Sequence, residues 1–383
     1  MRVFVLLCTA LGGMGQGVVA PRMPELLGDS SHLTLATGLS AGLMYLGIFL
    51  STRFYGRLAD RGRVHWLLGP GLLAYAAILL ALGTVTAPLG LFALRLIEGL
   101  ALSAIFVAAD FALGRLSTAG ERARWLSFYG IALSAGLLLG PALSLGVPRL
   151  ARALAFSPHL AASPLLALGP VALLAFAFGL AALPRRIPAA RSAPAKVPMP
   201  AAPLRAGAAY GFMEAGLVAV FPALAVKQFA IAPELSLLLV IATAGVSALP
   251  WGLLAERVGA APATRALLAL LAGGPLVLAA WSSTTAPTDA LPAYVGCICF
   301  GLIAGGLYPV AFAWLLETVS ESSYGEASGA FARAYGLGSL AGPLILGVAA
   351  EIWGSAGLFS VLAALGLLTL VTGGRRATPL RSA

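Results

Sequence analysis

The sequence predicts an all-α membrane protein of twelve transmembrane helices, arranged as two pseudo-symmetric six-helix bundles. Three observations lead to this fold class. Hydrophobic residues make up 60% of the 383 residues and charged residues only 10%, whereas soluble proteins carry about 25% charged residues. The apolar residues form runs long enough to cross a bilayer, which takes about 20 residues. The second half of the chain also repeats short motifs of the first half, about 200 residues later.

The spans follow from these apolar runs, separated by short polar turns. Residues 1–183 are expected to form the first bundle and residues 204–383 the second. Residues 184–203 are rich in Pro, Ala and basic residues, so they are expected to form a semi-stiff cytoplasmic linker. The predicted spans are 3–27, 36–56, 64–86, 88–115, 122–147, 162–183, 204–227, 234–255, 263–282, 290–316, 326–349 and 353–373.

Two pairs of segments carry the internal repeat. Met14 to Ala20 matches Met213 to Ala219, and Gly136 to Pro141 matches Gly338 to Pro343. Parallel six-helix repeats of this kind place a substrate site near the middle of the membrane, between the two halves. The repeat therefore predicts alternating access by rocking one half against the other.

Basic residues alternate between the loops on the two sides of the membrane. Seventeen lie on the side that holds both chain ends, and only Arg22, Arg149, Arg152 and Lys227 lie on the other. Cytoplasmic loops are enriched in Lys and Arg, so we expect a multi-pass protein of the plasma (inner) membrane with both termini cytoplasmic. The same distribution explains the net charge of +10 without a basic patch, so no nucleic-acid partner is expected.

The loop from Gly56 to Arg63 resembles the G-x-L-A-D-R-x-G-R signature between helices 2 and 3 of the major facilitator superfamily, although it lacks the residue expected between Arg61 and Gly62. A second copy, from Gly252 to Gly259, ends a hydrophobic segment of the other half. The resemblance implies the twelve-helix major facilitator fold over the whole chain.

The resemblance also implies a charge lock on the cytoplasmic side that holds the outward-facing state. An alternative is that these charges only anchor helix ends at the lipid–water boundary. The candidate gating residues are Gly56, Asp60, Arg61, Arg63, Asp110 and Arg333.

A G-x-x-x-G-P element occurs once in each half and resembles the motif of the drug/proton antiporters, an efflux-type branch of the superfamily. That resemblance implies a helix bend that seals the pathway, since proline removes a backbone donor and kinks a helix. Ordinary close packing through glycine is the alternative. The two elements comprise Gly136, Gly140, Pro141, Gly338, Gly342 and Pro343.

Arg95 and Glu98 lie three residues apart in an apolar span and resemble part of the R-x-x-x-G motif of the superfamily. A charged side chain inside a membrane is costly unless it meets a partner or water, and the i,i+3 spacing lets Glu98 neutralise Arg95. Arg95 could tune a proton-carrying acid or bind an anionic substrate group. Alternatively, the two residues form an ion pair that stabilises only itself.

Glu214 is the sharpest candidate, because it lies mid-span with no basic residue within two turns. Desolvation favours the protonated form of such a carboxyl group, which is the property of a proton carrier or a cation-binding group. The alternative is a protonated glutamate in a hydrogen bond between helices. Gln16 lies one position from the repeat-equivalent place and could add a neutral polar group to the same cavity.

The sequence offers no pattern of an enzyme. The three Cys and three His show no metal-ligand spacing, and no phosphate-binding loop is present. We therefore expect no cofactor and no catalytic residues. Transport would run on an ion gradient or downhill.

Taken together, the residues and the resemblance favour a secondary active transporter, with proton-coupled efflux of a small lipophilic compound by alternating access. Proton-coupled or facilitated uptake of a small nutrient is one alternative, and a non-transporting receptor or scaffold with the same fold is another. The expected partners are a small-molecule substrate, protons and the lipid bilayer, and the chain is expected to act as a monomer.

The first prediction concerns topology. A reporter fused after Ala383 should behave as cytosolic, because the basic residues gather on the side of both chain ends. Paired phosphatase and fluorescent-protein fusions measure this. A periplasmic signal at residue 383 would invert the topology and every site assignment that depends on it.

Overall fold

The computed structural model is all helical over the part of the chain that it describes. That part comprises residues 2–28, 32–60, 64–85, 87–116, 122–153, 199–229, 231–284, 290–319 and 324–373. The chain forms two compact units, one of residues 1–193 with 233–238 and the other of residues 194–232 with 239–383. Each unit is described by itself.

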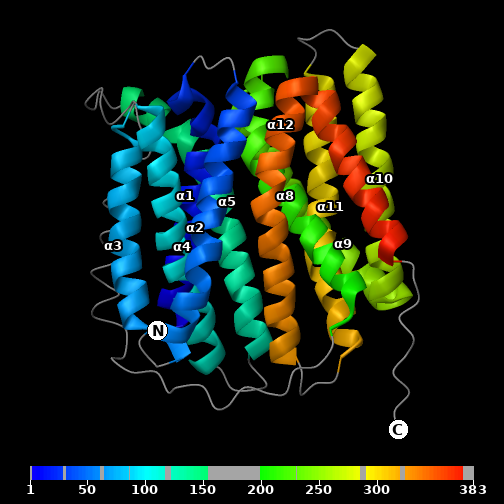
Figure 1. Cartoon of the computed structure of the whole chain (residues 1–383), viewed down its shortest axis with the longest axis horizontal. Coiled ribbons are helices and arrows are strands. Elements are labelled where there is room, and N and C mark those ends of the chain that lie inside the picture. Colours follow the sequence, from blue (N-terminus) through cyan, green and yellow to red (C-terminus); the bar gives the residue numbers. More distant parts are fainter. Residues whose placement is uncertain are drawn as a thin grey trace. The chain divides into compact units, whose positions relative to one another are not determined.

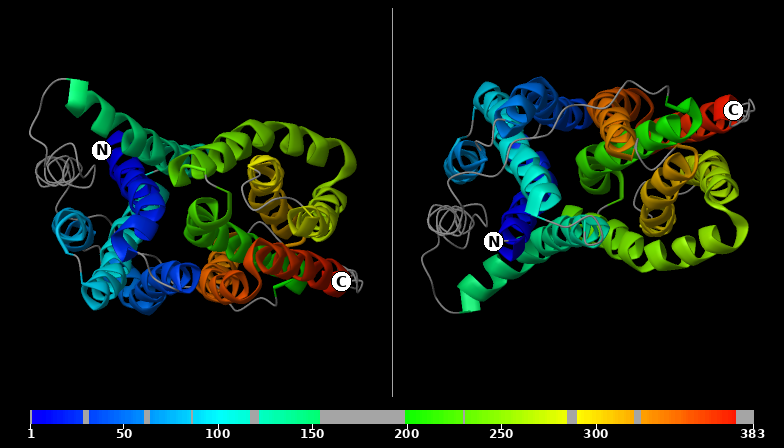
Figure 2. Two further views of the ribbon diagram at one scale, coloured as in Figure 1. Left: turned by 90° about the horizontal axis from the view of Figure 1, so that it is seen from above. Right: turned by 90° about the horizontal axis from the view of Figure 1, so that it is seen from below.

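The first unit contains five long helices, drawn from blue to blue-green in Figures 1 and 2. Helix α1 packs on α5, while α4 packs on both α2 and α3. The helices are α1 Arg2–Leu27, α2 Leu33–Asp60, α3 His65–Leu82, α4 Pro88–Leu116 and α5 Arg122–Ala153.

The second unit contains five further helices, drawn from green to red, except that residues 233–238 at the start of α9 belong to the first unit. Helix α12 packs on α8 and α10, and α11 packs on α8 and α10. The helices are α8 Ala201–Phe229, α9 Pro233–Val258, α10 Ala260–Thr284, α11 Leu291–Glu317 and α12 Tyr324–Gly373.

Helix α12 covers two predicted spans, 326–349 and 353–373. Its 50 residues would be about 75 Å long as a straight helix, against a hydrocarbon core of about 30 Å. The backbone breaks at Gly354, where φ is 62° and ψ is −148°. Glycine tolerates this conformation because it has no Cβ. The side chain of Gln228 then accepts a hydrogen bond from the backbone N–H of Ser355 at 3.0 Å, so the end of α8 helps to fix the break.

The two copies of the loop signature lie at equivalent helix ends. Gly56 to Asp60 closes α2, and Gly252 to Val258 closes α9. Gly259 ends α9 with a φ of 92°, a value that side chains with a Cβ rarely adopt. The second copy therefore keeps a glycine where the backbone requires one.

The predicted spans agree with the helices wherever the structure describes the chain. Ten of its helices are long and apolar enough to cross a membrane. The predicted span 162–183 and all but the last residues of the linker 184–203 lie outside the described residues, so the count of twelve stays a prediction.

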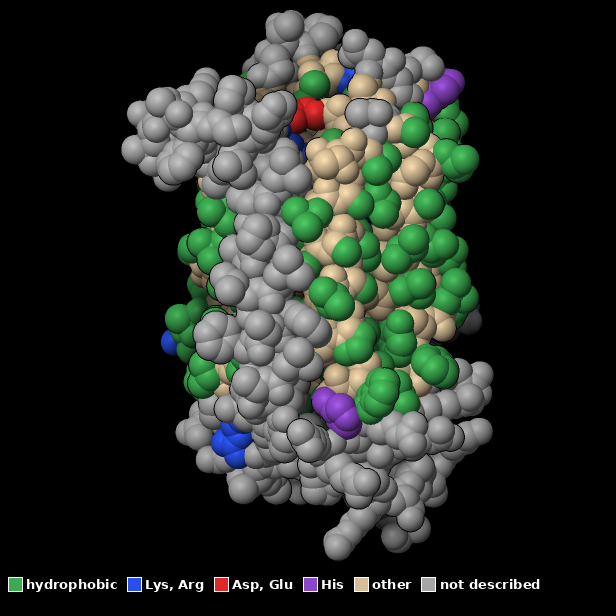
Figure 3. Space-filling view, turned by 90° about the vertical axis from the view of Figure 1, so that its left-hand side faces the viewer, with side chains coloured by type: hydrophobic (Ala, Val, Ile, Leu, Met, Phe, Trp, Pro, Cys, Tyr) green, Lys and Arg blue, Asp and Glu red, His purple; other side chains and the backbone are tan. Residues whose placement is uncertain are grey.

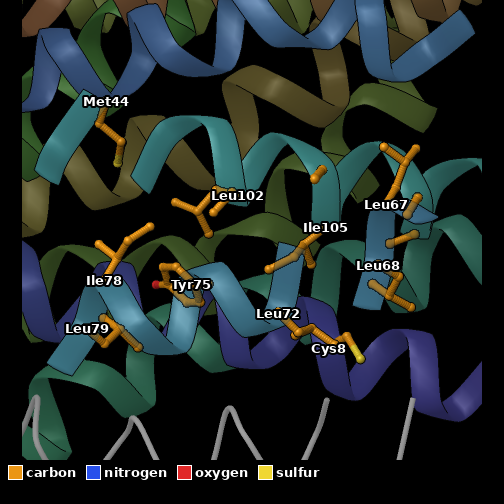
Figure 4. Packing of buried hydrophobic residues seen from close by; sticks show 14 of the residues in the cluster. Cys8, Met44, Leu67, Leu68, Leu72, Tyr75, Ile78, Leu79, Leu102 and Ile105 are labelled. Carbon is orange, nitrogen blue, oxygen red and sulfur yellow. The ribbon is translucent and has the colours of Figure 1, made fainter. Parts of the chain in front are cut away.

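The buried side chains and the outward-facing side chains are both largely apolar, as a bilayer environment requires. Figure 4 shows the interior of the first unit, where Leu72 and Tyr75 of α3 lie near Leu102 and Ile105 of α4. On the face shown in Figure 3, hydrophobic side chains cover the middle of the described helices and the histidines lie near their ends. This pattern fits helices that meet lipid along their length.

Helix crossings in both units depend on glycine. A Cβ on Gly136 would clash with the carbonyl oxygen of Ala10, and one on Gly140 would lie 2.5 Å from the carbonyl carbon of Gly17. These contacts bring α5 against α1 with no room for a side chain.

The second half repeats this arrangement. A Cβ on Gly338 would clash with the Ala208 carbonyl oxygen, and one on Gly342 with the Phe212 carbonyl oxygen. Here α12 lies against α8 as α5 lies against α1. The glycines of both G-x-x-x-G-P elements thus serve close packing, and Pro141 and Pro343 lie within helices that continue past them.

Matched alanine substitutions test these crossings. Gly136→Ala and Gly338→Ala should each destabilise the protein by about 1–3 kcal/mol, the usual cost of overpacking. Gly130→Ala and Gly336→Ala are the controls on the same helices, because a Cβ there meets nothing within 4 Å. The measurement is the thermal unfolding of purified protein in detergent. Equal melting temperatures within each pair would show that the helices do not approach so closely.

Candidate functional site

Arg95 and Glu98 form a buried ion pair within α4. The guanidinium Nη1 donates to Glu98 Oε2 at 2.5 Å, and the two side chains are only 4% and 0% exposed. The i,i+3 spacing predicted in the sequence therefore does join them. Among the described residues, Arg95 Nε and Glu98 Oε1 find no further hydrogen-bond partner, so the charges are balanced while some hydrogen-bonding capacity is not used.

Tyr75 of α3 is a neutral polar group in this interior, and sequence reasoning missed it. It is fully buried and lies within electrostatic reach of both Arg95 and Glu98. Its hydroxyl donates to the carbonyl oxygen of Gly12 at 3.2 Å, and a Cβ on Gly15 would clash with that hydroxyl. The ion pair is thus held inside the first unit, among α1, α3 and α4.

Gln16 is half-buried on α1. Its amide nitrogen lies 3.9 Å from the sulfur of Met44 on α2, a weak interaction. Whether Gln16 shares a cavity with Glu214 remains a prediction, because the two residues belong to different units.

Glu214 lies near the middle of α8 and is half-buried. The hydroxyl of Tyr335 on α12 donates to Glu214 Oε2 at 2.8 Å. Within the part of the chain that the structure describes, no Lys or Arg lies within ion-pair distance of this carboxyl group. The interhelical hydrogen bond considered from the sequence is therefore present, and its partner is a tyrosine that the sequence did not single out.

The predicted cytoplasmic gate is described only in part. Gly56 lies near the end of α2, where an added Cβ would meet no described atom within 4 Å, and Arg333 is exposed on α12. Asp60 and Asp110 lie in the final turns of α2 and α4, but their side chains, together with Arg61 and Arg63, lie outside the described residues. The charge lock stays a prediction.

The described residues contain no group of three His, Cys, Asp or Glu side chains that could hold a metal ion. The three cysteines are free thiols in helices α1 and α11. Two polar contacts inside the described membrane helices therefore concern titratable groups, the Arg95–Glu98 pair in one unit and the Glu214–Tyr335 hydrogen bond in the other.

Comparison with known families gives a match over both halves. The family model described as Major Facilitator Superfamily matches residues 5–208 and, a second time, residues 205–381. A comparison with curated proteins finds no match.

Several solved structures share the fold. A bacterial homologue of the human lysosomal transporter Spinster, in an inward-facing and occupied conformation, is 14% identical, with a TM-score of 0.76 over 97% of this chain and 94% of that chain. The nucleoside transporter NupG is 15% identical, with a TM-score of 0.70 over 97% and 96%. The human organic anion transporter MFSD10 is 19% identical, with a TM-score of 0.67 over 97% and 98%. At such identities the likeness shows the fold alone.

The buried pair generates a prediction about stability. Glu98→Gln should destabilise the protein by about 3–5 kcal/mol, because Arg95 would remain buried without its counter-charge. The double variant Arg95→Met with Glu98→Leu removes both charges and should recover most of that loss. Thermal unfolding of the purified variants measures both effects.

The control is Glu25→Gln, which breaks another i,i+3 pair, between Arg22 and Glu25. The side chain of Glu25 is 54% exposed. That change should cost less than about 1 kcal/mol. A Glu98→Gln variant as stable as Glu25→Gln would contradict the buried pair. Transport by the stable double variant then separates a role in the pathway from a pair that stabilises only itself.

Proposed function

The chain belongs to the major facilitator superfamily, and on that premise we propose that it is a proton-coupled secondary transporter that exports a small lipophilic compound by alternating access. That the protein is a transporter follows from the family, whose members handle small-molecule substrates. Proton coupling, the direction of transport, the plasma (inner) membrane location with cytoplasmic termini, and the monomeric state are the proposal.

The observation that carries the proposal is the bond between Glu214 and Tyr335. A carboxyl group near the middle of a membrane helix is costly as an anion, and the described residues provide no cation for it. Its stable form without an occupant is therefore the protonated one. A cationic occupant or water would have to be present when the proton leaves.

The tyrosine partner suits a group that changes its protonation state. A phenol hydroxyl can donate to an ionised carboxylate or accept from a protonated carboxyl group. The 2.8 Å bond to Tyr335 can therefore persist in both states with its direction reversed. Loading and release of the proton then need not break the contact between α8 and α12.

Export rather than uptake is supported by the resemblance of both G-x-x-x-G-P elements to those of drug/proton antiporters. Their glycines lie at the tight crossings α1–α5 and α8–α12, so the elements contribute packing in each half. Facilitated or proton-coupled uptake of a nutrient would use the same fold. A receptor or scaffold would bind a ligand without net flux, which the following assay distinguishes.

Glu214→Gln should abolish transport driven by a pH gradient. The amide cannot carry a proton, although it matches the protonated acid in shape and can still hydrogen-bond Tyr335. Downhill exchange at saturating substrate should survive. The measurement is flux in proteoliposomes with and without an imposed pH gradient, with wild type beside the variant.

Glu317→Gln is the matched control, because Glu317 is an exposed glutamate at the end of α11 in the same unit. It should transport as wild type does under both conditions. Full gradient-driven activity in Glu214→Gln would remove the proton-carrier role. The loss of stability caused by Glu214→Gln would then stay near the roughly 1–2 kcal/mol that an interhelical hydrogen bond contributes in a membrane.

A further inference from the structure

Three helices of the second unit each carry two aromatic or acidic side chains one turn apart. The pairs are Tyr210 and Glu214 on α8, Tyr308 and Phe312 on α11, and Phe331 and Tyr335 on α12. Residues at i and i+4 lie on the same face of a helix. Helices α11 and α12 therefore each contribute two aromatic rings on one face, and α8 contributes one ring and a carboxyl group.

One tyrosine from each of these helices joins a cluster of three rings. The ring centroids are 5.2 Å apart for Tyr210 and Tyr308, 5.8 Å for Tyr210 and Tyr335, and 5.9 Å for Tyr308 and Tyr335. The rings of Tyr210 and Tyr335 are stacked, while Tyr308 meets both edge-on. Because Tyr335 also donates to Glu214, the carboxyl group and the three rings form one connected set.

The members of this set are buried to different extents. Phe331 is fully buried, and its ring centroid lies 5.2 Å from that of Tyr308. It therefore packs against the cluster. Tyr308 is 38% exposed, and Tyr210, Glu214 and Tyr335 are half-buried. Part of each of these four side chains is therefore left uncovered.

The basic side chains of the neighbouring helices are engaged elsewhere. Arg205 of α8 donates to the Thr372 carbonyl oxygen at 2.8 Å, and the guanidinium of Arg265 of α10 lies 5.9 Å from the Trp314 ring centroid. Arg333 precedes Tyr335 by two residues on α12, which turns it by about 200° around the helix axis. The described contacts thus hold Arg205 and Arg265 elsewhere, and the Glu214 carboxyl group can supply a negative charge once it ionises.

We propose that Tyr210, Tyr308 and Tyr335, together with Glu214, bind the transported compound, and that this compound is an organic cation with an apolar body. The proposal rests on the proposed function, because it assigns a substrate class to the same carboxyl group. Aromatic ring faces attract cations most strongly where water is excluded, and the ionised carboxylate supplies the counter-charge. An organic anion of equal size would face both the ring faces and the carboxylate unfavourably.

The test begins with two probes that have nearly the same size and shape and opposite charge. Tetraphenylphosphonium and tetraphenylborate are titrated separately into purified full-length protein in a neutral detergent, without a pH gradient. Wild type should bind the cation at least about tenfold more tightly, in line with a desolvated cation–π contact. Equal affinities, tighter binding of the borate, or no binding of the cation would overturn the proposal. This comparison needs no variant to fold.

Variants then locate the site. Tyr308→Leu should weaken binding of tetraphenylphosphonium by about 5- to 30-fold, because the ring is lost, while Tyr308→Phe should stay within about threefold of wild type. Tyr294→Leu is the control, because Tyr294 is half-buried on the same helix, 14 residues earlier, which is about 21 Å along the axis. It should bind as wild type does. Equal weakening by the two leucine variants would overturn the assignment to this cluster.

The outcome is distinguishable from failure of the proposed function, because binding is measured without any gradient. If the tyrosines set the affinity and Glu214→Gln still transports on a pH gradient, the substrate class stands and the proton-carrier role falls. If Glu214→Gln loses gradient-driven flux and wild type does not prefer the cation, the proton-carrier role stands and the substrate class falls.

Discussion

Backbone contact between helices at glycine is the constraint on which both units depend. Without water in the bilayer core, helices cannot gain stability by removing apolar side chains from water, so they associate through close packing and polar contacts. The glycines of α5 and α12 meet the carbonyl groups of α1 and α8. A second set of crossings repeats the device, since a Cβ on Gly99 would clash with the Met44 carbonyl and one on Gly305 with that of Ala244. The two halves therefore share a packing scheme as well as a sequence pattern.

The same medium explains why these buried polar groups pair with a neighbour inside their own unit. Arg95 is neutralised by Glu98 on its own helix, and the Tyr75 hydroxyl finds a backbone carbonyl on α1. Glu214 differs from these groups, because its described partner is a neutral hydroxyl. An acid without a fixed counter-charge can respond to what enters the site, whereas a paired one cannot. This contrast is the physical reason to assign the changing charge to the second unit and a fixed charge pair to the first.

Hydropathy and the repeat were enough to predict the described helices, because a bilayer leaves a spanning segment almost no alternative to a helix. The glycine crossings were also visible as motifs, although the sequence left open whether they seal a pathway or pack helices. It could not predict the bond from Tyr335 to Glu214, since that depends on how α8 and α12 are rotated about their axes. The i,i+4 spacing of Tyr210 with Glu214, and of Phe331 with Tyr335, was the available signal. The break at Gly354 was expected only as a boundary near residue 350, and the hydrogen bond from Ser355 to the side chain of Gln228 could not be predicted from the sequence.

The glycine crossing at Gly342 and the hydrogen bond from Tyr335 to Glu214 both join α8 to α12. This restricts how a change of charge on Glu214 can act. Gly342 meets the Phe212 carbonyl two residues before Glu214, so α8 and α12 cannot slide past each other without a clash. Close-packed helices shift between discrete arrangements more readily than they deform continuously. A proton arriving at Glu214 can therefore reverse its bond to Tyr335 without loosening α8 from α12. On the proposed function, proton and substrate would then compete through the Glu214 carboxyl group while the contact between α8 and α12 is kept.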